Sequence, residues 1–360
     1  MARALVLDGP RDLRVDETET TALGPREVRI RARLSAISHG TELNLYRGTS
    51  AFAERVFDRE LRAFVAPDPP RPTYPATLGY ELVGRVAEIG ADVTEFRPGE
   101  LVHAGAPHGD EAVIDVDVSA RSTYPLVRLP EDTDAPSERW LFVSLGAVAL
   151  VAVHDARIKL GDHVVVIGLG AIGLLVVQMA RMAGAARIAA VDPVAARRDL
   201  ALGLGADAAL DPFAARDGAG AESKRLGGRG ADVAIETSGV TAGIHDAMAA
   251  AGLAARVVLL GFYQGGAPEV RFGEEWHHNR LDLVSSMGAW GAPHRDHPSW
   301  HRARVMETVV DLLAGGRLQV DGLPVRSFTF EQVVDAFAWL DEHPSEAVKV
   351  ALAYDGINPS

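Results

Sequence analysis

The sequence contains no cysteine, and this absence excludes several kinds of chemistry. Disulfides, cysteine nucleophiles and zinc sites built on thiolates are all impossible without that residue. Basic residues are also in the minority, with 36 Lys and Arg against 49 Asp and Glu, which gives a net charge of −13. A chain this acidic is not expected to bind nucleic acid or an anionic membrane surface.

Long apolar runs are absent as well. None approaches the roughly 18 residues of a membrane span without a charge or a glycine break. Residues 1–17 have the pattern of strand, turn and strand, with acids following a short apolar segment, which does not match a signal peptide. These observations predict a cytoplasmic protein. Its 360 residues leave room for two domains with substantial cores.

The most informative segment that is present covers residues 164–192, VVVIGLGAIGLLVVQMARMAGAARIAAVD. Its first four residues predict a buried parallel strand. Gly168, Gly170 and Gly173 then form G-x-G-x-x-G at the start of a predicted helix, with Ala171 and Ile172 between them. The glycines allow a tight turn, close approach of a pyrophosphate, and close packing of helix on strand. The free N–H groups of the helix terminus favour the same anion, so the segment predicts a dinucleotide site.

Asp192 ends the next predicted strand, residues 187–191. An acid about 20 residues beyond the glycines binds the ribose hydroxyls in such sites. A carboxylate accepts a hydrogen bond from a 2′-hydroxyl but repels a 2′-phosphate, so the sequence favours NAD(H) over NADP(H). Arg197 lies just downstream and is a further candidate cofactor contact, although the solvated start of the next helix is the favoured explanation of it.

The chain changes character near residue 145. Residues 1 to about 135 contain short β patterns separated by turns, which predicts an antiparallel, barrel-like domain. Later residues alternate between strand and helix patterns, which predicts a parallel sheet. A helix pattern at 331–342 and an apolar strand at 347–353 suggest that the chain returns to its first domain. Residues 52–65 have the apolar spacing of an amphipathic helix, which serves either as a lid or as a plain surface insertion.

Four further segments, in order, resemble the medium-chain dehydrogenase/reductase superfamily of zinc-type alcohol dehydrogenases. They are SHGTEL at 38–43, LGYELVG at 78–84, KLGD at 159–162 and GADVAIETSG at 230–239. The resemblance covers essentially the full length. It implies an α/β protein with a GroES-like, partly open β-barrel catalytic domain (1–145 and 299–360) and a Rossmann coenzyme domain with a doubly wound parallel sheet (146–298). LYRG at 45–48 and HHNRL at 277–281 resemble the branch of bacteriochlorophyllide a dehydrogenases and threonine-dehydrogenase-like proteins.

The positions of the family's catalytic zinc ligands correspond here to His39, Tyr80, Glu81 and Ser144. Tyr and Ser are poor ligands at neutral pH, because binding needs their deprotonated forms. Two good ligands do not make a catalytic zinc site, which normally has three and a water. The cysteine-rich lobe of the structural zinc is missing too. We therefore expect no zinc at either site.

Without zinc, another group must stabilise the oxygen that gains charge during hydride transfer. Tyr80 is the leading candidate, as a hydrogen-bond donor and acid/base, with His39 as its partner or as a proton carrier. Thr41 matches the hydroxyl of the family's proton relay, and Glu81 is expected to be structural or supporting. The alternative is that Tyr80 only fills the cavity of the absent metal and that His39 is a core histidine.

Other candidates follow from their positions at strand ends or from the resemblance. The remaining cofactor contacts expected are Val148, Thr237, Gly261, Phe262, Ser285 and Ser286. The remaining substrate contacts expected are Ser144, Tyr46, Trp290 and His277, although His277 and Trp290 suit a subunit interface equally well.

These features predict a zinc-independent, NAD(H)-dependent oxidoreductase that interconverts a secondary alcohol and a ketone on a small polar or natural-product-like substrate. Two alternatives remain: reduction of an activated C=C bond with NAD(P)H, and a dinucleotide-binding or redox-sensing protein without catalysis. By resemblance, the strand at 281–285 is expected to extend the sheet across a two-fold axis, which gives a homodimer or a dimer of dimers.

Overall fold

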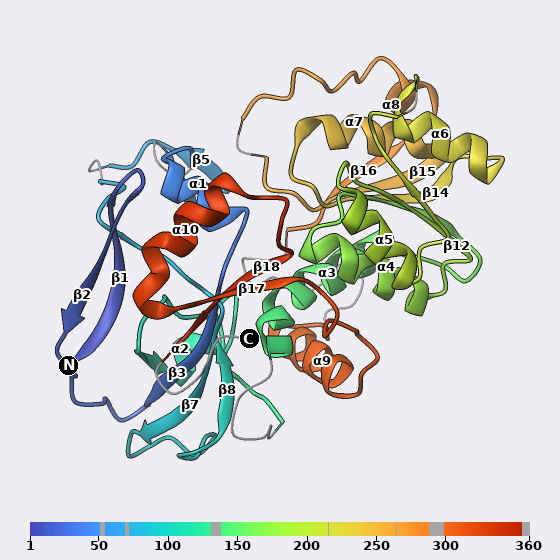
Figure 1. Ribbon diagram of the computed structural model, residues 1–360. Helices are drawn as coiled ribbons and strands as arrows, with labels where there is room; N and C mark the ends of the chain where they lie inside the picture. Colours follow the sequence, from blue (N-terminus) through green and yellow to red (C-terminus); the bar gives the residue numbers. More distant parts are fainter. Residues whose placement is uncertain are drawn as a thin grey trace. The chain divides into compact units, whose positions relative to one another are not determined.

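The computed structural model describes residues 1–50, 55–68, 72–130, 138–214, 216–263, 265–287 and 299–354. The chain divides into two compact units (Figure 1). The first unit comprises Met1–Leu141 and Pro324–Ser360, and the second comprises Phe142–Leu323. Each unit is described by itself below.

The first unit is built on antiparallel strands, as predicted. Its largest sheet has the order β10-β8-β7-β3-β18-β17, with β9 also paired to β3, and a smaller sheet has the order β2-β1-β6. The strands are β1 (Ala2–Gly9), β2 (Asp12–Thr18), β3 (Glu27–Ile37), β6 (Ala76–Thr77), β7 (Leu82–Ile89), β8 (Leu101–Ala104), β9 (Glu111–Asp115), β10 (Val127–Arg128), β17 (Val325–Thr329) and β18 (Lys349–Ala353). Its helices are α1 (Thr41–Arg47), α2 (Val116–Ser119) and α10 (Val333–Glu342), with short 3₁₀ turns at Glu138–Phe142 and Phe330–Gln332.

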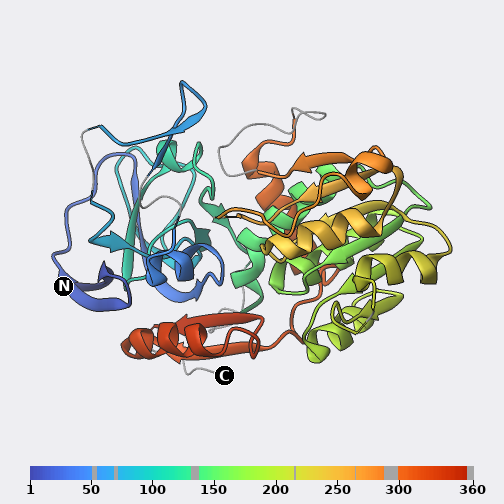
Figure 2. The same ribbon diagram turned by 90° about the horizontal axis from the view of Figure 1, so that it is seen from above.

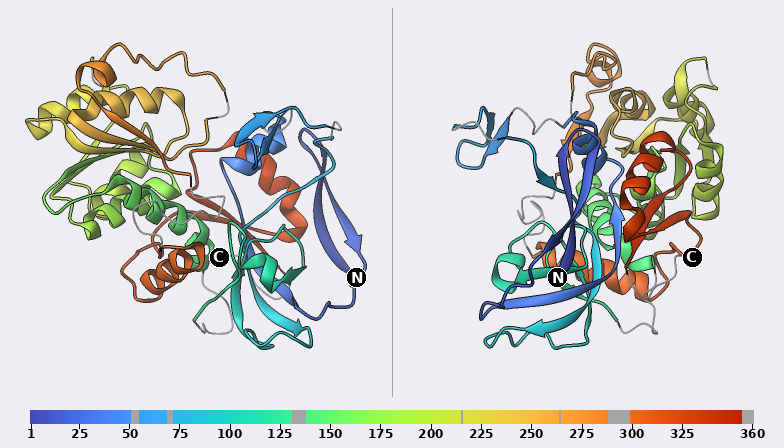
Figure 3. Two further views of the ribbon diagram at one scale, coloured as in Figure 1. Left: turned by 180° about the vertical axis from the view of Figure 1, so that it is seen from behind. Right: turned by 60° about the vertical axis from the view of Figure 1, so that its left-hand side comes forward.

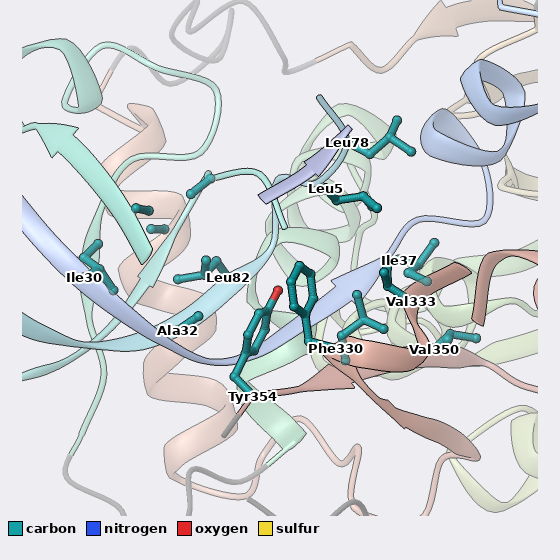
Figure 4. Packing of buried hydrophobic residues seen from close by; sticks show 14 of the residues in the cluster. Leu5, Ile30, Ala32, Ile37, Leu78, Leu82, Phe330, Val333, Val350 and Tyr354 are labelled. Carbon is teal, nitrogen blue, oxygen red and sulfur yellow. The ribbon is translucent and has the colours of Figure 1, made fainter. Parts of the chain in front are cut away.

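The C-terminal segment returns to the N-terminal strands, as the sequence predicts (Figure 3). Strand β18 pairs with β3, so Leu352 lies opposite Ser35. A capping box between Thr329 and Gln332 starts the turn that leads into α10. The apolar side chains of these elements meet in one core, where the rings of Phe330 and Tyr354 stack 4.8 Å apart (Figure 4).

The predicted amphipathic helix at 52–65 is wrong over its described part. Residues 56–65 form a hairpin of β4 (Val56–Asp58) and β5 (Ala63–Val65). The Asp58 carboxylate accepts hydrogen bonds from the backbone N–H groups of Glu60 and Leu61, and this closes the turn. The turn formed by Asp58 prevails over the helical spacing of the apolar residues. Phe57 and Phe64 therefore form a cross-strand pair, with ring centroids 5.3 Å apart.

The second unit is a parallel sheet with helices on both faces (Figure 2). The strand order is β13-β12-β11-β14-β15-β16, and every pairing is parallel. The strands are β11 (His163–Ile167), β12 (Arg187–Val191), β13 (Ala208–Leu210), β14 (Ala231–Glu236), β15 (Ala251–Leu259) and β16 (Asp282–Ser285). The helices are α3 (Val143–Ala156), α4 (Ala171–Ala183), α5 (Ala195–Gly203), α6 (Gly218–Gly227), α7 (Thr241–Ala250), α8 (Glu275–His278) and α9 (Arg302–Ala314). The doubly wound fold predicted for this part of the chain is confirmed.

The second unit continues to Leu323, beyond the expected boundary at residue 298. Helix α9 causes the difference, because it packs on α3 instead of joining the barrel. The contact is close: a Cβ added at Gly146 would lie 2.5 Å from a methyl carbon of Val309. The stretch Glu138–Ala156 is long and apolar enough to cross a membrane, but most of it is buried inside the protein, as in a core helix.

Candidate active site

The glycine turn of the second unit lies between β11 and α4, at the carboxyl edge of the parallel sheet. Gly168 adopts a φ of 86°, a conformation that side chains disfavour. A Cβ added at Gly173 would lie only 1.9 Å from the carbonyl oxygen of Gly168, so helix and strand pack too closely for a side chain. Thr237, at the end of β14, donates its hydroxyl to that same carbonyl oxygen over 2.7 Å.

The N-terminus of α4 is suited to an anion. Gly170 stands at the cap position and supplies no side-chain hydrogen bond, so the N–H groups of the first turn, which includes Ala171 and Ile172, meet no capping side chain. A Cβ at Gly170 would meet no atom within 4 Å. The open backbone and the positive end of the helix dipole fit the pyrophosphate of a dinucleotide.

Asp192 lies directly after β12 and is 4% exposed. One carboxylate oxygen accepts a hydrogen bond from the backbone N–H of Leu169 over 2.7 Å, and the other from that of Val194 over 2.8 Å. The acid therefore braces the glycine turn in addition to the ribose contact that the sequence predicts. Arg197 is half-buried in the first turn of α5, and the Arg198 guanidinium donates to the carbonyl oxygen of Asp192 over 2.7 Å.

The other predicted cofactor residues of the sheet also lie at its carboxyl edge. Gly261 and Phe262 follow β15, while Ser285 ends β16 and Ser286 follows it. The Ser286 hydroxyl is buried and accepts or donates no hydrogen bond among the described residues. Val148 and Ser144 lie on α3, where Ser144 is fully buried and Val148 is half-buried.

Two predicted substrate residues lie elsewhere in their own units. His277 lies on α8, just before β16 begins, and parallel strands place that position at the opposite edge of the sheet. Tyr46 lies on α1 of the first unit, where it is buried in the core against Phe337, with ring centroids 5.4 Å apart. Trp290 is outside the described residues.

Sequence analysis missed a buried carboxylate at the carboxyl edge. Glu236 ends β14 with no exposed surface and accepts hydrogen bonds from the Tyr263 hydroxyl, the Ser238 hydroxyl and the Ser238 backbone N–H. Burial raises the pKa of Glu236, and these hydrogen bonds oppose the rise. The sequence does contain a feature that points to Glu236, because this residue lies inside GADVAIETSG, the fourth segment that resembles the family.

The first unit contains a separate group of candidate residues. Tyr80 precedes β7, and its ring stacks on that of Tyr124, with centroids 4.9 Å apart and planes 10° apart. The residue is partly exposed, and burial of its phenol group is the largest cause of its pKa shift. This burial, with additional effects of Tyr124, Glu81 and Glu42, holds the pKa of Tyr80 well above its ordinary value. A hydrogen bond with Ser38 acts in the opposite direction.

Glu81, the next residue, forms a buried ion pair with Lys349 of β18. The carboxylate has no exposed surface and the ammonium group is 1% exposed. Burial raises the pKa of Glu81, although Lys349 opposes the rise. His103 on β8 is also fully buried, and burial followed by the charge of Lys349 lowers its pKa to about 3, which keeps the imidazole neutral.

These residues do not fit a catalytic zinc ion. Glu81 already pairs with Lys349, and a phenol binds a metal ion in its deprotonated form, which burial disfavours at Tyr80. His39 is half-buried in the turn before α1, and Thr41 is exposed at the start of that helix. Among the described residues, His245, Glu274 and Glu275 of the second unit could together hold a metal ion, but none of them occupies a ligand position of the family.

A second buried polar chain runs through the first unit. Glu42 on α1 accepts a hydrogen bond from the Ser38 backbone N–H over 2.8 Å and contacts the Nε2 of His108 over 2.9 Å. The Nδ1 of His108 lies 2.8 Å from the Ser35 hydroxyl, which lies 2.9 Å from the hydroxyl of Tyr354. All five side chains are at least nine-tenths buried. Sequence analysis named none of them as functional.

Comparison with known proteins places these features in a family. Residues 24–124 match the alcohol dehydrogenase GroES-like domain, and residues 171–301 match the zinc-binding dehydrogenase model. D-Guloside 3-dehydrogenase of Escherichia coli K12 is 33% identical over 362 residues, covering 98% of this chain and all of the relative. (R,R)-Butanediol dehydrogenase of Bacillus subtilis is 27% identical over 349 residues, covering 90% of this chain and 92% of the relative.

Solved structures give the same fold. The crystal structure of 2R,3R-butanediol dehydrogenase from B. subtilis superimposes with a TM-score of 0.77 at 24% identity, covering 98% of this chain and 99% of that chain. A dehydrogenase from E. coli CFT073, complexed with NADH, gives a TM-score of 0.74 at 20% identity, with coverage of 98% and 99%. The barrel, the parallel sheet and the full-length relatives together show that the chain belongs to the medium-chain, zinc-type alcohol dehydrogenase family and is an oxidoreductase.

Proposed function

We propose that this oxidoreductase uses NAD(H), works without zinc and interconverts a secondary alcohol and a ketone on a small polar substrate related to polyols or sugars. The observation that carries the proposal is the ion pair of Glu81 with Lys349, which occupies one metal-ligand position of the family, beside a phenol, Tyr80, at another. The names of the relatives support the substrate class, since position 3 of a guloside and both carbons of the diol carry secondary alcohols.

The second unit would hold the dinucleotide through groups that fit it. The first turn of α4 would bind the pyrophosphate, and Asp192 the ribose. When bound, NAD(H) accepts or donates the hydride. The carboxylate of Asp192 repels a 2′-phosphate, and this supports NAD(H) over NADP(H).

Residues of the first unit would donate and accept the proton of the reaction. In the direction of ketone reduction, the Tyr80 hydroxyl donates a hydrogen bond to the carbonyl oxygen and then its proton to the forming alkoxide. A high phenol pKa suits this role, because it keeps the proton on the oxygen until the alkoxide, a stronger base, appears. His39 would return a proton to Tyr80 after each turnover, since an imidazole titrates near neutrality.

Replacement of Tyr80 by Phe tests this assignment directly, because it removes the hydroxyl and keeps the ring. A positioned acid/base contributes about 10²–10⁴-fold, so we expect kcat to fall within that range while the Kd for NADH stays unchanged. Tyr74→Phe is the matched control, because the Tyr74 hydroxyl donates to the carbonyl oxygen of Leu45 in the same unit. His39→Ala should lower kcat similarly or move the pH optimum.

Turnover is first measured with NAD⁺ and a panel of secondary alcohols, polyols and glycosides, by the absorbance of the NADH that forms. If Tyr80→Phe keeps a normal kcat on the best substrate, the phenol only fills space, and Thr41 is the next residue to test. Zinc in stoichiometric amount, with activity lost on chelation, would contradict the metal-free site. Faster NADH oxidation by enones than by the matching ketones would favour C=C reduction instead.

We also propose that the protein is a homodimer or a dimer of dimers. Strand β16 is the last strand of its sheet, and among the described residues the backbone groups of its outer edge pair with no other strand. A second copy would cover this edge. Light scattering should give at least twice the monomer mass of 38.3 kDa at micromolar concentration, and a monomer would refute the proposal.

A further inference from the structure

The carboxylate of Glu236 connects two loops at the carboxyl edge of the parallel sheet. One oxygen accepts hydrogen bonds from the Ser238 hydroxyl and, over 2.7 Å, from the Ser238 backbone N–H. The other oxygen accepts from the Tyr263 hydroxyl and, over 3.4 Å, from the Gly239 backbone N–H. Because Ser238 and Gly239 follow β14 and Tyr263 lies in the segment after β15, one side chain ties the ends of two paired strands together. We call Glu236, Ser238 and Tyr263 the Glu236 clamp.

The Glu236 clamp is closely packed. A Cβ added at Gly243, in the first turn of α7, would lie 2.7 Å from one carboxylate oxygen of Glu236, and a Cβ at Gly261 would lie 3.0 Å from the other. The same Cβ at Gly261 would lie 2.9 Å from the Tyr263 ring. Burial, followed by the charge of Glu236 and the hydrogen bond to it, raises the pKa of Tyr263, so its hydroxyl keeps its proton and donates. Both the spacing and the hydrogen bonds therefore hold the Tyr263 ring in one place.

The Glu236 clamp borders the glycine turn and carries exposed residues. A Cβ added at Gly168 would lie 2.6 Å from the backbone nitrogen of Ser238, so the loop after β14 packs directly on the turn after β11. On the other side, Tyr263 anchors the residue before it, Phe262, which is 44% exposed at the carboxyl edge. A buried carboxylate thus fixes the positions of two exposed residues, Ser238 and Phe262.

The order of the strands indicates which half of a dinucleotide would lie beside the Glu236 clamp. The chain runs outward from β11 through β12 to β13, and it continues on the other side of β11 with β14 and β15. A dinucleotide lies across such an edge at the point where the order reverses. Asp192, after β12, would bind the ribose of the adenosine half, since that ribose carries the 2′-phosphate of NADP(H). The nicotinamide half would therefore lie on the side of β14 and β15.

We propose that Glu236 is a positioning residue that, through Ser238 and Tyr263, holds the loops after β14 and β15 in the arrangement that receives the nicotinamide half of the cofactor. The inference rests on the proposed use of a nicotinamide dinucleotide. Loops that are fixed before binding lose less conformational entropy when the ligand binds, and this raises affinity without a direct contact. The effect is specific to the nicotinamide half, because Asp192 and the first turn of α4 would bind the rest of the cofactor.

Replacement of Tyr263 by Phe tests the inference, because it removes the hydrogen bond to Glu236 and keeps the ring. Fluorescence titration measures the binding of NADH, and calorimetry measures that of ADP-ribose, which lacks the nicotinamide. A hydrogen bond to a charged group contributes roughly 10–100-fold to an equilibrium constant, but only part of this affects a ligand that the bond does not touch. We therefore expect the Kd for NADH to rise about tenfold and that for ADP-ribose to change less than about twofold. Tyr74→Phe in the first unit also loses a single hydroxyl bond, and as the matched control it should change neither Kd.

A second variant, Glu236→Gln, shows whether Glu236 and Tyr263 act together. Gln has one acceptor oxygen instead of two, so it cannot accept from both Tyr263 and the Ser238 backbone N–H. The Kd for NADH should rise at least as much as in Tyr263→Phe. The double variant should bind NADH about as well as Glu236→Gln alone, because the second change removes a bond that is already broken. Effects that multiply in full would overturn the proposed role of Tyr263 as the connection between Glu236 and the loop.

The comparison of the two ligands separates positioning from general damage to the sheet. Equal weakening of NADH and ADP-ribose in folded Tyr263→Phe overturns the inference, and so does an unchanged Kd for NADH. If Tyr263→Phe does not fold, Glu236→Gln takes its place in the same comparison, with the same outcomes. If the parent protein binds NADPH more tightly than NADH, the proposed use of NAD(H) fails. A selective loss of NADPH affinity, measured against 2′-phospho-ADP-ribose, would then still support the Glu236 clamp.

Discussion

The two units reach their candidate sites by different means. At the carboxyl edge of the second unit, the groups that would meet a dinucleotide are mostly backbone: the turn at Gly168, the first N–H groups of α4, and the close approach at Gly173. In the first unit, the groups are side chains that bind one another, such as Glu81 with Lys349. A backbone site depends on shape, whereas a side-chain site depends on chemical identity.

This difference teaches where chemistry can change within one family. The glycine turn leaves no room for a side chain at Gly168 or Gly173, because a Cβ at either position would lie less than 3 Å from a backbone atom. The barrel tolerates a new set of polar residues so long as each buried group finds a partner. Tyr80 in place of a metal ligand is acceptable because Tyr124 stacks on its ring and Ser38 bonds its hydroxyl. We therefore expect relatives of this chain to share the cofactor and to differ in how they handle the proton.

The largest effect should come from breaking the ion pair of the first unit. Lys349→Met leaves Glu81 buried without a cation, which typically costs about 3–5 kcal/mol of the free energy of unfolding. The pKa of Glu81 is already raised by burial, and it rises further without Lys349. Because the carboxyl pKa is raised in the folded protein, its contribution to stability is complete below the ordinary value of 4.5 and is lost as the pH rises above it. The stability lost in Lys349→Met should therefore be larger at pH 8 than at pH 5.

Chemical denaturation at both pH values measures this loss. Lys159→Met, at an exposed position of the second unit, should cost little at either pH. Adding Glu81→Gln to Lys349→Met removes the stranded charge and should restore part of the stability. A loss of stability that does not change with pH would contradict this prediction. A loss of NADH affinity as large as the loss of stability would show that the two units do not respond separately.

The next largest effect should come from the glycine turn. Gly173→Ala places a Cβ 1.9 Å from the carbonyl oxygen of Gly168 and 2.8 Å from the Thr237 hydroxyl, and a backbone carbonyl cannot move aside cheaply. Overpacking costs roughly 1–3 kcal/mol, so the Kd for NADH should rise by about 10–100-fold. Fluorescence titration of NADH measures it, and Gly203→Ala, where a Cβ meets no atom within 4 Å, is the matched control. A Kd within threefold of the parent protein would show that this site is less rigid than its backbone suggests.

The same contrast explains what the sequence could and could not predict. Strands β11 and β12, the helix after the glycines and the place of Asp192 follow from local patterns, and the structure has them within a residue. The partner of Glu81 lies 268 positions away, and that of Ser35 lies 319 positions away, so no local pattern marks either pair. The helix predicted at 52–65 rests on the spacing of four apolar residues, Phe52, Val56, Leu61 and Val65, whereas the turn at Asp58 makes residues 56–65 a hairpin.

A smaller effect is expected at the ribose position. Asp192→Ser removes the charge that repels a 2′-phosphate, so the preference for NADH over NADPH should fall. The same change removes the hydrogen bonds to Leu169 and Val194 that brace the glycine turn, so affinity for both cofactors should fall as well. Those hydrogen bonds stabilise the turn and do not touch the cofactor, so only part of their free energy affects binding, and we expect NADH affinity to fall roughly tenfold, or about 1.4 kcal/mol. A parent protein that prefers NADPH in parallel titrations would refute the assignment of Asp192.

The smallest effect should come from the hairpin of β4 and β5, which belongs to the first unit but pairs with neither of its sheets. Its contacts include the ring pair of Phe57 and Phe64 and the Arg62 guanidinium over the Phe57 ring. Such pairs contribute about 0.5–1.5 kcal/mol beyond area burial, and here Phe64 is one of the exposed apolar side chains, so Phe57→Ala should lower the unfolding free energy by no more than about 1 kcal/mol. If the segment is a plain surface insertion, kcat and KM for the alcohol should stay within twofold. A KM that rises several-fold, with kcat and NADH affinity unchanged, would instead make the hairpin a lid over the substrate, and the side chains that recognise the substrate would then extend beyond the two sheets of the first unit.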